Sequence, residues 1–355
     1  MIVFFIILVL LVAFLEYFLS RYTLKRISLK ITAEKYLVEP DEELAIKITL
    51  NNRSALPAFF LTARCNVPGK AKLCENQRGK LDSYGNLGEY SVSCFLMPKQ
   101  TAEFSVKIKI PDRGLYRLTN FSVSAGDFIG IKTKSREFRG TEEFVVIPRC
   151  LEDVDISFLS GGLMGERSVN RQIHEDPILT VGFREYTGRE PQKSISWTRS
   201  LQSGRLMVKQ YDHTTDRKLT LLFSSEGAGD KSIEYCYKLC RTVCEKLERE
   251  QIPFSFYHSG CLQTSIGRLP LLKSGLGEQH LSRILEGLGR ANSYTAEVSV
   301  DEMVNMVLKR DYDTNCCVLI TPKKSETDIS AMNRLKARTG AAVFILDGQT
   351  EADDE

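Results

Sequence analysis

The sequence predicts an N-terminal transmembrane helix, an all-β sandwich domain and an α/β domain, in that order. Three observations support this prediction: an apolar run over residues 2–19, short alternating segments over 27–148, and short apolar runs alternating with helical patterns over 217–348. The chain of 355 residues has room for all three. The expected boundaries are 1–20 for the anchor, 27–148 for the sandwich, 149–216 for a linker with a motif, 217–348 for the α/β domain and 349–355 for an acidic tail.

Charge and cysteine content narrow the class of protein. The net charge is only +3, and no long Lys/Arg run is interleaved with aromatic residues, so nucleic-acid binding is not predicted. The ten Cys form no C-x-x-C pair, which argues against a zinc site. Scattered Cys with apolar neighbours are typical of a reducing compartment.

The apolar run from Ile2 to Leu19 is interrupted only by Glu16. As a helix with a rise of about 1.5 Å per residue it spans roughly 27 Å, which is enough for a bilayer core. A cleaved signal peptide is the competing interpretation, but the run has neither a basic start nor a small-residue cleavage site. Basic residues follow the run, so the positive-inside rule predicts a single-pass protein of the cell membrane with its bulk in the cytoplasm. These basic residues are Arg21, Lys25, Arg26 and Lys30.

Residues 27–148 are predicted to form an antiparallel β-sandwich. In residues 104–110 every second side chain is apolar, as in a strand with one buried face. Turn residues separate such segments, and the polar stretch from Asn66 to Leu87 is predicted to be a long hairpin loop. The domain would serve as a spacer or interaction module. The expected strands are 28–33, 44–50, 59–65, 91–96, 102–110, 119–125, 130–134 and 143–147.

Residues 217–348 are predicted to form a parallel sheet covered by helices on both faces, because strands alternate with helices of sufficient length. The expected strands are 219–223, 253–257, 316–321 and 342–346, and the expected helices are 231–250, 276–286, 301–309 and 326–338.

The cysteines of this half are predicted to pack in the core. Cys236, Cys240 and Cys244 follow one another at i+4 on a helix, and we identify no fourth ligand that would make them a soft-metal site. Cys316 and Cys317 are neighbours on one strand, so they should point to opposite faces of the sheet.

A distinctive motif lies between the two halves and contains the only Trp of the chain. It runs through Phe183, Arg184-Glu185-Tyr186-Thr187-Gly188-Arg189, Ser194-Ile195-Ser196-Trp197 and Leu206-Met207-Val208-Lys209 to Tyr211. The motif resembles the domain of unknown function 58 family, whose members carry R-E-Y-x-x-G-D-x-x-R-x-I-D-W followed by L-x-V-K/R-x-F/Y. Two acids of that pattern are replaced here, by Arg189 and Ser196. Weaker similarity at Arg113-Gly114 and at residues 125–130 and 145–148 extends the resemblance over nearly the whole chain.

The resemblance implies an α/β domain similar to a von Willebrand factor A domain. Such domains can bind a divalent cation through oxygen ligands in a D-x-S-x-S sequence after the first strand. The corresponding residues here are Phe223-Ser224-Ser225-Glu226-Gly227, in which Phe replaces the leading carboxylate. We therefore expect a degenerate site at Ser224, Ser225 and Thr321, with no working metal site and no other cofactor.

Common enzyme patterns are missing from the sequence. There is no G-x-x-x-x-G-K-[ST], no G-x-S-x-G and no H-E-x-x-H. His174-Glu175-Asp176 resembles a surface loop rather than a positioned acid–base pair. The sequence therefore predicts no catalytic residues, and the protein is expected not to be an enzyme.

The motif is predicted to be an interface rather than an active site. Its mixture of basic and acidic residues indicates internal ion pairs and a partner surface. Trp197 and its aromatic neighbours would suit packing against the α/β domain, so the motif is expected to join the two domains. The residues expected to form this interface are Phe183, Arg184, Glu185, Tyr186, Gly188, Ile195, Trp197, Leu206, Lys209 and Tyr211.

The function expected from these observations is that of a membrane-anchored interaction or scaffold protein. The resemblance implies a role beside a MoxR-type AAA+ ATPase and a transglutaminase-like membrane protein, in assembling or regulating envelope components of a bacterium. The alternative is a divalent-metal-dependent ligand-binding or adhesion module with Ser224, Ser225 and Thr321 as oxygen ligands. An undetected hydrolase is a third hypothesis.

Overall fold

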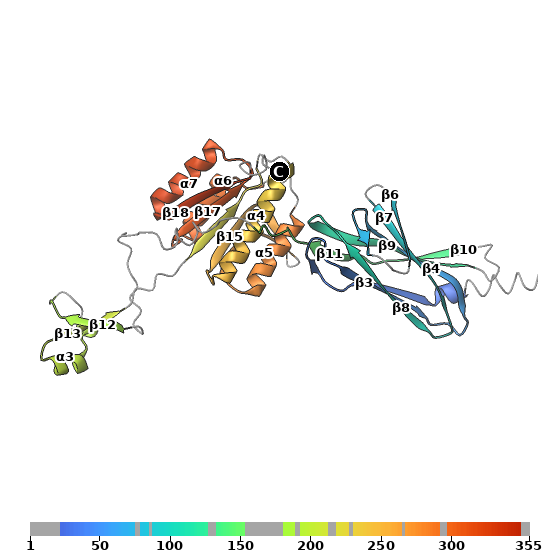
Figure 1. Ribbon diagram of the computed structural model, residues 1–355, viewed down its shortest axis with the longest axis horizontal. Helices are drawn as coiled ribbons and strands as arrows, with labels where there is room; N and C mark the ends of the chain where they lie inside the picture. The colour runs from blue at the N-terminus through green and yellow to red at the C-terminus, as the bar shows by residue number, and fades with distance from the viewer. Residues whose placement is uncertain are drawn as a thin grey trace, which may run out of the picture.

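The computed structural model describes residues 22–74, 79–84, 87–126, 133–152, 180–188, 192–211, 218–226, 230–264, 267–291 and 297–348. It contains a β-sandwich, an α/β domain and a small third unit (Figure 1). The predicted anchor at 1–20, the loop at 174–176 and the tail at 349–355 lie outside the described residues. Among the helices of the described ranges, none has the length and apolar character needed to cross a bilayer.

The first domain is the predicted β-sandwich. One sheet has the order β1-β3-β8-β5 and contains Ile27–Ala33, Leu44–Asn52, Thr101–Lys109 and Lys72–Leu73. The second sheet has the order β2-β11-β9-β4-β7-β6 and contains Leu37–Val38, Glu142–Val146, Gly114–Gly126, Ala58–Pro68, Leu87–Leu96 and Lys80–Tyr84. Strand β10 (Thr133–Phe138) also pairs with β9.

The alternating pattern of the strands produces the core of the sandwich. Ile46, Ile48 and Leu50 of β3 are buried in the same cluster as Val123 and Ala125 of β9, which belongs to the other sheet. Burial of an aliphatic side chain of this size contributes about 1.5–3 kcal/mol. The apolar faces of the two sheets therefore pack on each other, as the period of two in the sequence predicts.

Three details of the predicted sandwich are wrong. Residues 66–87 are not one loop, because they include β5, which pairs with β8, and β6, which pairs with β7. The strand expected at 130–134 is β10, at Thr133–Phe138. The two-residue β2 was not predicted. Short or polar edge strands lack the apolar alternation that identifies the central ones.

The second domain has a five-stranded sheet with the order β16-β15-β14-β17-β18. These strands are Gly267–Gly275, Phe254–Thr264, Leu219–Phe223, Cys316–Thr321 and Ala342–Asp347. The four predicted strands are parallel to their neighbours, but β16 was not predicted and pairs antiparallel with β15, so the sheet is mixed. The helices are α4 (Asp230–Arg249), α5 (Glu278–Arg290), α6 (Val300–Arg310) and α7 (Glu326–Thr339).

Helices cover both faces of this sheet, as predicted. Leu221 and Cys316 pack with α4 and α5, whereas Leu222 and Cys317 pack with α6 and α7. The opposite orientations of Cys316 and Cys317 are thereby confirmed. The three thiols of α4 lie fully buried in the first of these clusters, and burial raises the pKa of Cys236 to about 12. They pack as small apolar side chains, as predicted.

The third unit, which we call the motif unit, comprises the described residues of 180–211. Strands β12 (Thr180–Glu185) and β13 (Met207–Tyr211) pair antiparallel, and between them lie a 3-10 turn (Gln192–Ser194) and α3 (Trp197–Ser203). Helix α3 ends at Gly204, whose φ of 68° suits a glycine C-cap. The Ser200 hydroxyl donates to the Ser196 carbonyl at 2.8 Å and accepts from the Met207 amide at 2.8 Å. Ser200 thus fixes α3 on β13.

Candidate functional site

The sandwich and the α/β domain are joined by buried arginines. The first of them is Arg113, which precedes β9 of the sandwich and contacts both α4 and α5. Its side chain is only 6% exposed, and it donates to both carboxylate oxygens of Glu234 on α4, each at 2.8 Å. It also donates to the carbonyls of Leu288 and Ala291 at 2.8 and 3.0 Å. Because the last carbonyls of a helix have no partner within it, Arg113 satisfies the end of α5. Its guanidinium lies over the Tyr237 ring, 3.5 Å from the centroid.

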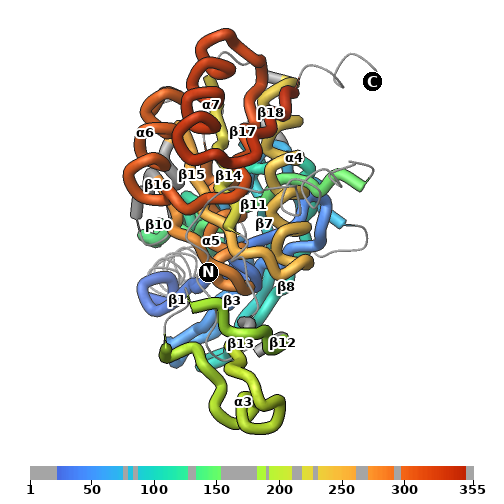
Figure 2. Tube along the Cα trace, turned by 90° about the vertical axis from the view of Figure 1, so that its left-hand side faces the viewer, coloured from blue at the N-terminus to red at the C-terminus, as the bar shows by residue number. Residues whose placement is uncertain are grey.

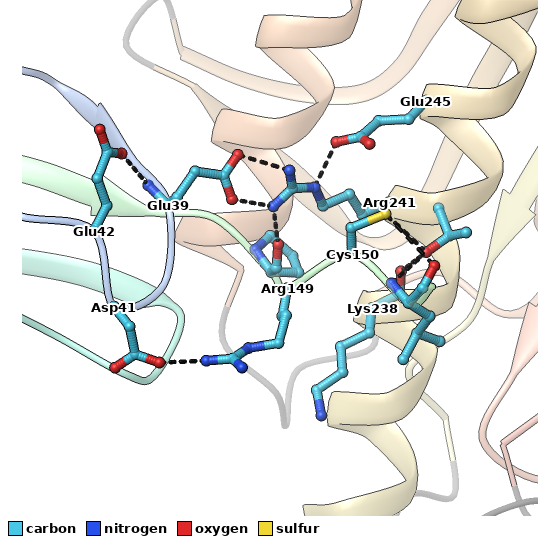
Figure 3. Close-up of polar contacts among 11 residues, drawn as sticks. Glu39, Asp41, Glu42, Arg149, Cys150, Lys238, Arg241 and Glu245 are labelled. Carbon is cyan, nitrogen blue, oxygen red and sulfur yellow. Dashed lines mark hydrogen bonds and ion pairs between the residues drawn. The ribbon is translucent and has the colours of Figure 1, made fainter. Parts of the chain in front are cut away.

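A second arginine crosses the same boundary from the other side (Figure 3). Arg241 of α4 donates to both carboxylate oxygens of Glu39, at 2.5 and 2.7 Å, and to the Pro148 carbonyl at 2.5 Å. It also donates to Glu245, one turn further along the helix, at 2.6 Å. The Leu151 amide donates to the Thr242 hydroxyl at 2.9 Å, so the chain that leaves the sandwich is held along α4.

The end of α5 supplies the third set of contacts. Arg290 donates to Glu143 of β11 at 2.5 Å, to Glu286 at 3.0 Å and to the Tyr36 hydroxyl. The neighbouring Gly289 lies against β11 so closely that a Cβ there would be 2.4 Å from Val145 Cγ1 and 2.9 Å from the Val146 carbonyl oxygen. Only glycine permits this approach of helix to strand.

These contacts correct the predicted join between the domains. The prediction that the motif joins them is wrong, because the join is formed by residues of β2, β9 and β11 and the loops that flank them, together with α4 and α5 (Figure 1). The prediction that Trp197 packs against the α/β domain is also wrong, because its side chain is 64% exposed. The Arg113-Gly114 pair noted in the sequence instead supplies a central contact of the join.

The predicted degenerate metal site lies at the carboxyl edge of the α/β sheet. Ser224 follows β14 and Thr321 is the last residue of the neighbouring β17, and the Ser224 amide donates to the Ile320 carbonyl at 2.9 Å. The Ser225 hydroxyl lies 2.9 Å from the hydroxyl of Ser259, a residue of β15 that the sequence did not single out. The Thr321 hydroxyl donates to the Lys323 carbonyl at 3.2 Å. The Ser224 hydroxyl accepts from the Glu226 amide at 3.3 Å, and all four of these side chains are buried.

An aromatic cluster lies at the end of β14, at the position where the D-x-S-x-S sequence of von Willebrand factor A domains begins with a carboxylate. The Phe223 ring stacks on His258 at 4.9 Å and contacts Tyr237 at 4.7 Å, measured between ring centroids. Burial and the charge of Arg113 lower the pKa of His258 from 6.5 to about 3, so this imidazole is neutral at physiological pH. The cluster connects the sheet edge to Arg113 of the sandwich by packing.

We expect no saturable binding of Mg²⁺ or Mn²⁺ at this edge. Within the described residues no group of three or more His, Cys, Asp or Glu side chains is placed to hold a metal ion, and hydroxyls alone are poor ligands for these cations. Isothermal titration calorimetry of the purified chain should show only dilution heat. Saturable binding that disappears in Ser225→Ala would contradict this prediction and support the metal-dependent alternative.

The motif unit exposes an apolar surface, which we call the Trp197 patch. Trp197 is 64% exposed and Leu201 85% exposed, and their spacing of four residues places them on the same face of α3. Phe183 and Leu206 on the flanking segments are 36% and 46% exposed. Ile195 and Val208 are buried and bridge the unit internally.

Polar residues of the predicted interface lie around this patch. Arg205 pairs with Glu185 at 2.5 Å, and the Arg199 guanidinium lies 5.2 Å from the Phe183 ring centroid. The Tyr186 amide donates to the Leu206 carbonyl at 2.8 Å, and Gly188 adopts a positive φ of 87°.

All ten predicted interface residues lie in this one unit. Arg184 and Glu185 lie in β12, and Lys209 and Tyr211 lie in β13. Sequence reasoning missed Leu201, whose side chain is 85% exposed. Its position four residues after Trp197 would have identified it only if a helix had been predicted over 197–203. Ser259 and the contacts of Arg113 with the α/β domain were missed as well.

Comparisons with known proteins give no family. No protein-family model matches the chain, and no curated protein matches it. Among solved structures, a CARDB domain from Pyrococcus furiosus is similar to 34% of this chain and 84% of its own, with 14% identity and a TM-score of 0.22. A cohesin from Archaeoglobus fulgidus covers 34% and 91%, with 11% identity and a TM-score of 0.24. A type II cohesin domain from Acetivibrio cellulolyticus covers 34% and 94%, with 13% identity and a TM-score of 0.25.

Proposed function

We propose that this chain is a membrane-anchored, non-enzymatic interaction protein whose bulk lies in the cytoplasm. The observation that carries the proposal is the exposure of Trp197 on a unit that projects from the α/β domain (Figure 1). Large exposed aromatic side chains are unfavourable in water and are preferred anchors of protein interfaces. A membrane segment at 1–20 would hold the assembly at the bilayer.

The α/β domain is proposed to be a degenerate von Willebrand factor A-like domain. Numbered from β14 along the chain, its strands have the order 3-2-1-4-5, so the switch point of the sheet lies between β14 and β17. Ligands of open α/β sheets bind outside the carboxyl ends of the strands at such a point. Here that position is occupied by Phe223 and by the hydroxyls of Ser225 and Ser259, which are hydrogen-bonded to each other. This arrangement favours a supporting role for the domain over metal-dependent adhesion.

The proposed partner is a MoxR-type AAA+ ATPase, working with a transglutaminase-like membrane protein in envelope assembly or its regulation. This part of the proposal rests on the resemblance of the motif. It is consistent with an exposed motif unit that leaves its patch accessible to another protein.

The partnership is tested by isolating the tagged full chain from detergent-solubilised membranes, with and without a non-hydrolysable ATP analogue. We expect an AAA+ ATPase to be enriched, and Trp197→Ala to reduce its recovery by about tenfold or more, because truncation of a central aromatic anchor commonly costs at least 2 kcal/mol. Lys70→Ala, on the exposed surface of the sandwich, is the matched control and should retain the partner. Failure to enrich any AAA+ ATPase under either nucleotide condition would refute the partnership.

A further inference from the structure

The motif unit has a small buried core and a large exposed apolar face. Among residues 182–188 and 192–209 the buried side chains are Ile195, Ser196, Ser200 and Val208, of which two are apolar. Isolated two-stranded sheets are marginally stable at best, and chains below about 40 residues usually need a metal, a disulfide or a partner. Within the described residues no metal-ligating cluster and no disulfide supplies that stability. A partner that covers the Trp197 patch would supply it.

The charge of the unit indicates the chemistry of that partner. Residues 180–211 contain six basic and two acidic side chains, and five of these basic residues lie within the described ranges. They are Arg184, Lys193, Arg199, Arg205 and Lys209. The Arg199 guanidinium lies 5.2 Å from the ring centroid of Phe183, a residue of the patch, so positive charge borders the patch. A second copy of this unit would bring like charges together, which disfavours self-association.

The place of the unit argues against a lipid surface. Arg136 of β10 donates to the carbonyls of Leu24 and Lys25, so the first described residues lie beside β10. Figure 1 places β10 at one end of the molecule and the motif unit at the other, beyond the α/β domain. In the perpendicular view of Figure 2, the unit lies below the helices and sheet of that domain. A bilayer that holds residues 1–20 would therefore be at the end opposite to the patch.

We propose that the Trp197 patch docks into an apolar groove with an acidic rim on a partner protein. Trp197 and Leu201 would occupy the groove, while Lys193, Arg199 and Arg205 would face its carboxylates. Charge complementarity of this kind sets the approach and register of two proteins, and the apolar anchors supply most of the affinity. This inference deepens the proposed function by specifying the surface used and the chemistry of its partner.

The test places a photo-crosslinking residue, benzoylphenylalanine, at position 201 of the full chain in its native membranes. Leu201 is 85% exposed, so the replacement leaves the small core of the unit intact. We expect a single protein adduct whose crosslinked peptide contains apolar residues flanked by Asp or Glu. Charge reversal by Arg199→Glu should lower the adduct yield by about tenfold, whereas Arg199→Lys should preserve most of it. Reversing an acidic residue of the crosslinked site to Lys should restore the yield with Arg199→Glu.

Other outcomes would overturn the inference. These are an adduct with phospholipid, an adduct with a second copy of this chain, no adduct at all, or a protein adduct whose yield is insensitive to Arg199→Glu. Lys70→Glu, an equal change of charge on the sandwich, is the matched control and should leave the yield unchanged. The result is separable from the AAA+ partnership: an ATPase recovered equally well with Arg199→Glu would retain the partnership and reject this surface. A charge-sensitive adduct with a different acidic protein would retain this surface and reject the AAA+ partnership.

Discussion

Arg113→Ala is expected to destabilise the join between the sandwich and the α/β domain by about 3 kcal/mol. The change removes the donor that Arg113 supplies to the Leu288 and Ala291 carbonyls at the end of α5, and loss of a hydrogen-bond partner to a buried polar group costs about 1–3 kcal/mol. It also removes the cation over the Tyr237 ring. Glu234 is 42% exposed and would be partly solvated after the change, so its stranded charge adds less than that of a fully buried carboxylate.

Hydrogen exchange of the full chain in detergent, read by mass spectrometry, measures this effect. Faster exchange is expected at the end of α5 and in β11, with α6 and α7 unaffected because they pack on the other face of the sheet. Arg117→Ala on the neighbouring β9 is the matched control: that side chain is 59% exposed, and its 3.5 Å pair with Glu143 should contribute little. Equal effects of the two substitutions would show that Arg113 is not central to the join.

The central strands of the α/β domain could be predicted closely from the sequence. Strands β14 and β17 begin and end at the predicted residues, 219–223 and 316–321. Both are apolar runs buried on two faces, so each of their residues contributes to the pattern. The edge strand β16 was missed because its sequence, GRLPLLKSG, has Gly at both ends and Pro inside, residues that weaken a strand pattern.

The arrangement of the domains could not be predicted, because it depends on contacts between distant residues. Arg113 and the carbonyls that it satisfies are 175 and 178 residues apart in the chain. No local pattern records such a pairing, and an Arg just before a strand is ordinary on a protein surface. A lone Trp likewise suits both a buried contact and an exposed anchor, and the structure decides between them for Trp197 by its exposure.

Gly289→Leu is expected to separate α5 from β11 and to cost about 3 kcal/mol or more. A Cβ at this position would lie 2.4 Å from Val145 Cγ1 and 2.9 Å from the Val146 carbonyl oxygen, so helix and strand must move apart to admit it. Overpacking of a close contact typically costs 1–3 kcal/mol, and the remaining atoms of Leu add to the overlap. Gly289→Ala should also destabilise, although Ala stabilises a helix interior by about 1 kcal/mol relative to Gly.

The sign of the Gly289→Ala effect shows whether Gly289 is required for the close approach of α5 to β11 or has no packing role in the helix. Stabilisation by this change would show that α5 does not approach β11 as described, whereas Gln279→Ala, at an exposed position of the same helix, should have little effect.

Combined with Arg113→Ala, the Gly289→Leu variant should show a clearly sub-additive loss of stability. Once α5 has moved away from β11, its carbonyls are solvated and no longer depend on Arg113. Additive costs would mean that the two residues stabilise separate contacts. Sub-additive costs would show that the sandwich and the α/β domain are held by one cooperative join.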